Sequence, residues 1–217
     1  YPALDKLINE IEKKAKSVEG LVKTGRTHLM DAMPIDLSDE LRAWTSQLNS
    51  SRNMLGVIEQ RFLELPQGGT AVGSGVNAHK QFAKYFAQEV TKLSGNKYKS
   101  VPSENFFHEL SAQDCSVQLS GELKNLAVIL MKISNDLRWM NSGPLAGLSE
   151  IELQALQPGS SIMPGKVNPV IPEAVTMASA DVIGNDVTIT VAAQAGNFQL
   201  NVMLPVIAYN LLKSINL

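Results

Sequence analysis

The chain of 217 residues is poor in cysteine, in long apolar runs and in net charge. Cys115 stands alone, so no internal disulfide can form, and such low cysteine use is typical of a reducing compartment; we therefore expect a cytoplasmic protein. The strongest apolar run, LAVILM at 126–131, is too short to span a bilayer. Nineteen basic residues are scattered among 21 acidic ones, a pattern that argues against nucleic-acid binding.

Patterns that bind metals or activate thiols are also missing. The three histidines, His28, His79 and His108, lie in unrelated segments without the spacing that a zinc site requires. We expect His79 and His108 to be ordinary histidines at the surface or at helix ends. Cys115 falls in the middle of a predicted helix, where small buried thiols are common, so nothing supports a nucleophilic role for it. We expect no metal site.

The sequence does have a strong helical rhythm in two long segments, 37–65 and 105–141. Their apolar positions recur at alternating spacings of three and four: Leu41, Trp44, Leu48, Ser51, Leu55, Ile58, Phe62 and Leu65 in the first, and Leu119, Leu123, Leu126, Leu130, Ile133, Leu137 and Met140 in the second. A seven-residue repeat predicts long helices that pack at shallow crossing angles. The fold class we predict is all-α, as an elongated bundle of long helices.

A third long helix is expected over 170–195, where small and apolar residues dominate. A helix this apolar is buried on most of its sides, which indicates assembly between subunits. Shorter helices are expected over 2–18, 79–94 and 198–217, and no segment shows a convincing alternating β pattern. Glycine and proline mark the connections, of which the one at 142–169 is unusually long for a bundle.

That long connection ends in GSSIMPGKVNP, residues 159–169, which we call the signature loop. It is not a nucleotide-binding P-loop, because five residues instead of four separate Gly159 from Gly165, and Val167 occupies the place of the required hydroxyl. A second glycine-rich segment, GSGVNA at 73–78, resembles a dinucleotide fingerprint but follows a helix instead of a strand. We interpret it as a turn between helices.

The signature loop has the composition of an anion site. Asn168 and Pro169 read as the cap and first residue of a helix, whose positive end would face the loop together with Lys166. His28 is a side chain that titrates near neutrality, and Glu173 could orient it. An alternative stays open at this point: Ser160 and Ser161 could be flexible spacers, and Lys166 a solvated charge.

Four blocks carry a resemblance to a known family: the signature loop, KTGRTHLMDAMP at 23–34, GGTAVGSGVN at 68–77 and SGPLAGL at 142–148. They are similar to the shared blocks of the fumarase/aspartase superfamily, and the resemblance extends over essentially the whole chain. His28 and Gly165 favour class II fumarases, since aspartases typically carry Gln and Ala there. Leu145 departs from the Arg of many members, which leaves the role of that position open.

The resemblance implies reversible anti elimination of water from (S)-malate to give fumarate, through an aci-carboxylate intermediate and without a metal or cofactor. By the same analogy Ser160 removes the C3 proton, and His28, paired with Glu173, acts on the departing hydroxyl through water. Thr27 contacts the substrate. The resemblance assigns the binding of a substrate carboxylate to Ser161, Lys166, Val167 and Asn168.

Members of this family are about twice as long and build each active site from three subunits of a homotetramer. The chain starts with YPALDK and ends with LLKSINL, and it lacks the family blocks S-S-N-D-x-F-P-T and G-S-G-T-x-x-N-M-N. We therefore expect residues 1–217 to be the central helical-bundle domain of a longer polypeptide, inactive when isolated. The alternatives are an aspartate ammonia-lyase and a non-catalytic helical oligomerisation module.

Overall fold

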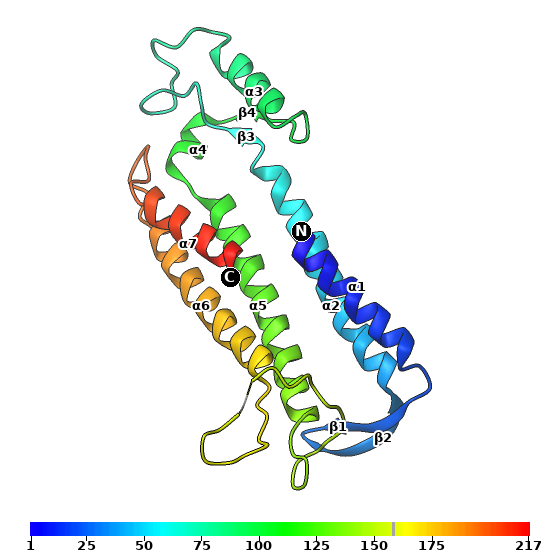
Figure 1. Ribbon diagram of the computed structural model, residues 1–217. Helices are drawn as coiled ribbons and strands as arrows, with labels where there is room; N and C mark the ends of the chain where they lie inside the picture. Colours follow the sequence, from blue (N-terminus) through cyan, green and yellow to red (C-terminus); the bar gives the residue numbers. More distant parts are fainter. Residues whose placement is uncertain (158) are drawn as a thin grey trace. The chain divides into compact units, whose positions relative to one another are not determined.

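The computed structural model describes residues 1–157 and 159–217, and helices dominate this part of the chain (Figure 1). This confirms the predicted all-α helical bundle. The elements, in chain order, are α1 Pro2–Ser17, β1 Val22–Thr27, β2 Met30–Asp36, α2 Leu37–Arg61, β3 Glu64–Leu65, α3 Phe82–Leu93, β4 Val101–Pro102, α4 Phe106–Ser111, α5 Asp114–Met140, α6 Val170–Gln194 and α7 Leu204–Asn216. None of the helices in the described residues is both long and apolar enough to cross a membrane.

The chain divides into two compact units. The first contains residues 1–53 and 125–180, and the second contains residues 54–124 and 181–217. Helices α2, α5 and α6 each contribute residues to both units. The prediction of a single domain over 1–217 stays a prediction.

The core of the first unit follows the predicted heptad positions. Leu41, Trp44 and Leu48 of α2 are buried, with Trp44 only 2% and Leu48 0% exposed. They form one apolar cluster with residues of α1 and α5, namely Ile8, Ala15, Ile129, Ile133 and Met140. Burying this much apolar area is the main source of stability for the unit.

The core of the second unit is built by α6 and α7. Ile189 and Ala192 of α6 pack with Ile207 and Leu211 of α7, and the α5 residues Leu119 and Leu123 complete the cluster. Beside this cluster, Asp186 is 5% exposed and accepts hydrogen bonds from Ser120 Oγ at 2.7 Å and Lys124 Nζ at 2.6 Å. A buried charge paired in this way favours one register of α5 against α6.

Several predicted helices have different bounds in the structure. The segment 37–65 is helical only as far as Arg61, since Glu64–Leu65 form β3, and the segment 79–94 is helical only from Phe82 to Leu93. The segment 105–141 forms two helices, α4 and α5, because Ala112 is extended, with φ −97° and ψ 152°. The segment 198–217 becomes helical only at Leu204, because the side chain of Asn201 bonds to the backbone before and after it and holds these residues in a non-helical connection. Its amide nitrogen donates to the carbonyls of Ala192 and Ala193 at the end of α6, and its oxygen accepts from Met203 N at 2.7 Å.

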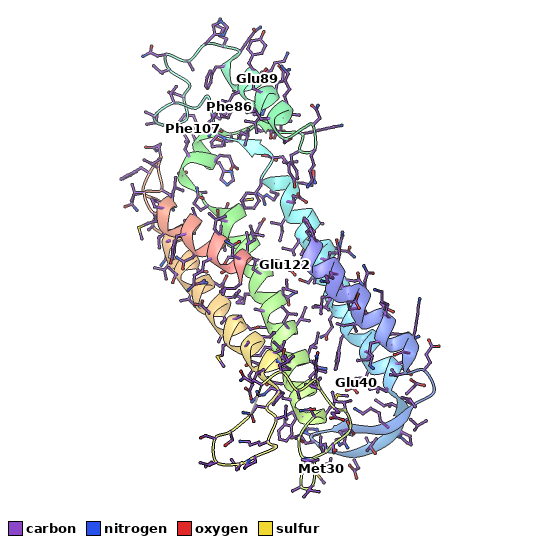
Figure 2. All side chains as sticks on the ribbon, in the orientation of Figure 1. Met30, Glu40, Phe86, Glu89, Phe107 and Glu122 are labelled. Atoms are coloured by element: carbon purple, nitrogen blue, oxygen red, sulfur yellow. The ribbon has the colours of Figure 1, made fainter. Side chains whose placement is uncertain are left out.

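The expectation of no β structure was wrong for residues 22–36. Strands β1 and β2 pair in antiparallel fashion from Val22↔Asp36 to Thr27↔Met30, where Met30 is labelled in Figure 2. His28 and Leu29 form the two-residue turn, and their φ values of 55° and 61° are those of a type I′ hairpin. Almost all of β2 is exposed on both faces, so no alternation of apolar and polar residues reveals the strand in the sequence.

Gly25 shapes the middle of this hairpin. The pairing shifts between Thr24 and Arg26, which leaves Gly25 at a β-bulge. A Cβ atom on Gly25 would lie 2.6 Å from the carbonyl oxygen of Met33, so the strands can approach only at a residue without a side chain. Two further strands, β3 and β4, form a short parallel pair in the second unit.

Candidate active site

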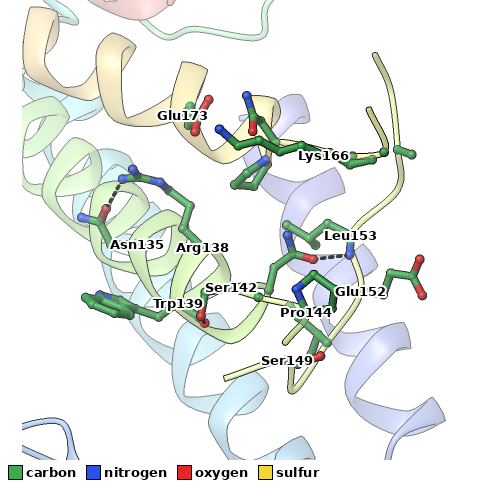
Figure 3. A pocket seen from close by; sticks show the side chains of 18 residues that line it. Asn135, Arg138, Trp139, Ser142, Pro144, Ser149, Glu152, Leu153, Lys166 and Glu173 are labelled. Atoms are coloured by element: carbon green, nitrogen blue, oxygen red, sulfur yellow. Dashed lines mark hydrogen bonds between the residues drawn. The ribbon is translucent and has the colours of Figure 1, made fainter. Parts of the chain in front are cut away.

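A cleft of about 710 Å³ lies within the first unit (Figure 3). Its wall is formed by the last turn of α5, by the segment that follows α5, and by residues 165–169 together with the first turn of α6. Four of the residues predicted for the site line this cleft: Lys166, Val167, Asn168 and Glu173. The structure therefore brings the second half of the signature loop and the start of α6 into one cavity.

The signature loop is held by bonds within itself. Asn168 Nδ2 donates to the carbonyl oxygen of Gly159 at 3.1 Å, which joins the two ends of the loop. A side chain at Gly159 would collide with the carbonyl of Lys166, and Gly165 has a φ of 78°, a backbone conformation that favours glycine. These glycines allow the tight folding that turns Lys166 toward the cleft wall.

Ser160 and Ser161 are not among the residues that line the cleft in the described part of the chain. Ser160 is half-buried and Ser161 is exposed. The backbone N–H of Ile162 donates to Ser160 Oγ at 3.2 Å. A donor of this kind favours a negative charge on the serine oxygen over the neutral hydroxyl.

Helix α6 begins at Val170, as the predicted range 170–195 requires, but its cap is one residue later than the sequence assigned. Glu173 N donates to the carbonyl of Pro169 at 3.2 Å, so Pro169 occupies the cap position that the sequence assigned to Asn168. The helix still points its amino-terminal end at the residues of the signature loop that line the cleft. Its partial positive charge adds to that of Lys166 and favours an anion in this cavity.

Thr27 and His28 lie elsewhere in the first unit, at the exposed tip of the β1–β2 hairpin. Neither lines the cleft in the residues that the structure describes. The structure thus does not bring His28 to Glu173 within this chain, although the sequence paired them. His28 and Leu29, both with positive φ, are two non-glycine residues in a strained conformation, a feature that often marks a functional site.

Several residues of the cleft wall were not predicted from the sequence, among them Asn135, Arg138 and Glu152. Arg138 is exposed in the last turn of α5, and its Nη1 donates to Asn135 Oδ1 at 2.9 Å (Figure 3). A cation at this position is ordinarily explained by the negative end of the helix dipole, so the sequence offered no separate signal for it. Arg138 gives the cleft a second cation besides Lys166.

Two other reactive side chains, Cys115 and His108, are not among the residues that line the cleft. Cys115 is the second residue of α5 instead of lying in the middle of a helix, and burial raises the pKa of its thiol to about 11, which makes it a poor nucleophile. His108 bridges α4 and α5 through Asp114 Oδ2 at 3.0 Å. No group of three or more His, Cys, Asp or Glu residues that could hold a metal occurs in the described residues.

Comparison with known proteins relates this arrangement to a family. The sequence model of a family described as Lyase matches residues 1–184. The chain belongs to this lyase family. Among curated lyases, the class II fumarate hydratase 2 of Pseudomonas aeruginosa is 58% identical over 216 residues, which cover 100% of this chain and 47% of that protein. The class II fumarate hydratase of Bacillus subtilis is 49% identical, with 100% and 46% covered.

Solved structures of lyases agree with the sequence comparison. A class II fumarase from Schistosoma mansoni has a TM-score of 0.97 and 38% identity, covering 99% of this chain and 48% of that one. A fumarate lyase:delta crystallin from Brucella melitensis bound to cobalt has a TM-score of 0.94 and 43% identity, covering 99% and 46%. The predicted relationship to class II fumarases is confirmed, and the chain spans about half the length of the curated relatives it matches.

Proposed function

We propose that the protein containing this chain is a fumarate hydratase, which interconverts (S)-malate and fumarate, and that residues 1–217 are its central helical domain. One observation carries the proposal: Lys166 and Asn168 of the signature loop line a cleft at the amino-terminal end of α6. A dicarboxylate can pair with Lys166 and Arg138 in this cleft and with the positive end of α6, although the wall also carries Glu152 and Glu173.

The difficult step is removal of a C3 proton next to a carboxylate, since the product is an aci-carboxylate that carries two negative charges. Positive and hydrogen-bonding groups that face this carboxylate lower the barrier most when they are already in place before the reaction. Lys166 and Asn168 have this role in the proposed mechanism, together with Ser161 and Val167 of the same loop. No cofactor or metal takes part in any step.

Ser160 is the proposed base for the C3 proton. A serine hydroxyl is ordinarily far too weak a base, so the alkoxide must be stabilised by its surroundings. The Ile162 N–H that donates to Ser160 Oγ supplies part of this stabilisation, and Lys166 supplies charge from the same loop. Closure of the loop over bound substrate would bring Ser160 to the reacting carbon and exclude water.

His28 and Glu173 complete the mechanism across subunits. In the proposed homotetramer the hairpin tip of one subunit supplies Thr27 and His28, and Glu173 of another orients His28 for the departing hydroxyl. The apolar surface of α6 supports assembly, since Met177 is 69%, Val187 61% and Val191 53% exposed in the isolated chain. The reaction is a step of the tricarboxylic acid cycle, and we place the enzyme in the cytoplasm.

Turnover by the full-length protein tests the proposal. Malate and aspartate are offered separately, and the ultraviolet absorbance of fumarate is followed. We expect fumarate from malate alone, whereas fumarate from aspartate alone would identify an ammonia-lyase. Lack of turnover with both would favour a non-catalytic oligomerisation module. The chain of residues 1–217 by itself is expected to be inactive, and sedimentation of the full-length protein should show a tetramer.

A further inference from the structure

Four charged residues of the first unit connect the hairpin to the segment that follows α5. Glu150 Oε1 accepts from Arg26 Nη1 at 2.5 Å, and Glu150 Oε2 lies 3.0 Å from Lys23 Nζ. Lys23 also donates to Glu40 Oε2 at 2.6 Å, and Glu40 lies in the first turn of α2 (Figure 2). We call Lys23, Arg26, Glu40 and Glu150 the Glu150 cluster.

The Glu150 cluster is shielded from solvent and balanced in charge. The side chains of Lys23 and Glu150 are only 13% and 15% exposed. Burial raises the pKa of Glu150, but its contacts with Arg26 and Lys23 outweigh this effect and hold the pKa below its ordinary value. Glu150 is therefore ionised at neutral pH. Two anions face two cations, so loss of one member leaves a partly buried charge without its partner.

Glu150 stands on a rigid support. Its backbone N–H donates to the carbonyl of Met140 at 2.8 Å, as does that of Ile151 at 3.2 Å. Met140 is the last residue of α5 and is 4% exposed within the core of the first unit. The carboxylate of Glu150 is thus fixed to the bundle, and the hairpin is fixed to the carboxylate.

The tip of the hairpin needs such a support. Arg26 directly precedes Thr27 and His28, and the tip residues His28 and Leu29 both have positive φ. A conformation of this kind persists only where the surrounding structure holds it in place, and a two-stranded hairpin is marginally stable by itself. The tip is exposed, so core packing cannot provide the restraint. The hydrogen bond from Arg26 to Glu150 and the ion pair of Lys23 with Glu150 provide a partly buried restraint close to the tip.

We propose that Glu150 is a positioning residue for catalysis, which holds Arg26 and thereby sets the place of Thr27 and His28. Glu150 does not touch the substrate. The inference rests on the proposed function, in which Thr27 and His28 act on the substrate. A displacement of about 1 Å at a reacting group can lower a rate by about a hundredfold, so a support of this kind acts on kcat.

The test uses Glu150→Gln in the full-length enzyme, with Asp39→Asn as the matched control. Asp39 lies beside Glu40 in the first turn of α2, but its side chain is 72% exposed and outside the Glu150 cluster. We expect kcat for malate to fall by about tenfold or more in Glu150→Gln, with KM changed by less than about threefold, because the signature loop binds the carboxylate. Asp39→Asn should behave like the parent enzyme.

The effect should disappear where His28 is already lost. In a His28→Asn background, Glu150→Gln should lower kcat by less than about twofold, whereas a loss of stability would persist in thermal unfolding. An undiminished effect in that background would overturn the inference, as would an unchanged kcat in Glu150→Gln or a fully active His28→Asn. A parent enzyme that does not turn over malate would instead contradict the proposed function.

A second variant covers the case in which Glu150→Gln does not assemble. Arg26→Lys keeps the positive charge but removes the planar guanidinium that reaches Glu150 Oε1. We expect the same selective loss of kcat, smaller than in Glu150→Gln, and again little effect in the His28→Asn background. An Arg26→Lys enzyme with the parent kcat would show that the tip does not depend on this contact.

Discussion

Ser160 illustrates how a single residue depends on its neighbours for its chemistry. The hydroxyl oxygen receives the N–H of Ile162 at 3.2 Å, so the backbone of the signature loop already provides a donor for a negatively charged oxygen. Ser161, its neighbour, is exposed and has only a proposed binding role. The two serines therefore allow a comparison within one loop.

Replacing Ser160 with Ala should abolish the base. We expect kcat for malate to fall by about 10² to 10⁴, the usual contribution of a general base, with little change in KM. Ser161→Ala is the matched variant and should act mainly on KM. Steady-state kinetics of the full-length enzyme measure both effects. Normal turnover in Ser160→Ala would mean that another group removes the proton.

Replacing Lys166 with Gln removes a charge from the cleft while keeping much of the side-chain volume. A hydrogen bond to a charged group contributes more than a neutral one, so we expect kcat/KM for malate to fall by about tenfold to a hundredfold. Lys80→Gln, at an exposed position of the second unit, serves as the control and should leave kcat/KM unchanged. Equal values for both variants would remove Lys166 from the proposed site.

The β1–β2 hairpin is the element whose shape depends most on one glycine. At Gly25 the strands approach so closely that an added Cβ would contact the carbonyl oxygen of Met33 at 2.6 Å. Gly56, by contrast, lies within α2, and a Cβ added there would meet no atom within 4 Å beyond its chain neighbours and the adjacent backbone of its own helix. Replacement by alanine should therefore lower the stability at Gly25 and raise it at Gly56.

Gly25→Ala should lower the free energy of unfolding by about 1–3 kcal/mol, because the strands must separate to admit the methyl group. Gly56→Ala should raise it by about 0.5–1 kcal/mol, since alanine is the better residue in a helix interior. Urea unfolding followed by circular dichroism compares the two variants. A stabilised Gly25→Ala protein would show that the hairpin tolerates a side chain at the bulge.

For the molecule as a whole, partly buried charges set the pH range over which the fold is stable. Glu150 has a pKa held below its ordinary value of 4.5, and Lys23 has a pKa raised above 10.5 by Glu40 and Glu150, although burial acts in the opposite direction. The Glu150 contribution is complete above the unfolded pKa and is lost as the pH falls through the folded one. The Lys23 contribution is complete below its unfolded pKa and is lost as the pH rises through the folded one.

We therefore expect the free energy of unfolding to decline as the pH falls below about 4.5, in part through protonation of Glu150. In Glu150→Gln this decline should be shallower, and stability at neutral pH should be lower from the start. Urea unfolding at a series of pH values measures both, with Glu104→Gln, at an exposed position, as the control. If the free energy of unfolding declines at low pH as steeply in Glu150→Gln as in the parent, other carboxylates cause the decline.

Much of the fold could be predicted because a helix that buries one face has apolar residues at regular helical spacing in its sequence. Leu41, Trp44 and Leu48 recur at helical spacing since each must face the same core, and the structure buries all three. The hairpin has no such pattern in its sequence, because neither face of β2 is buried. The break between α4 and α5 was missed for a similar reason, since a local change of backbone angle at Ala112 needs no special residue.

Lys166, Asn168 and Glu173 were predictable as parts of one site, because they lie close together in the sequence at a helix start. That local information determined the helices, the signature loop and the family. Only the tertiary structure decided that Arg138 shares their cleft, that Glu150 holds Arg26, and that His28 stands at an exposed hairpin tip away from Glu173. The physical reason is that contacts between distant segments depend on how elements pack, and spacing along one chain carries no record of that packing.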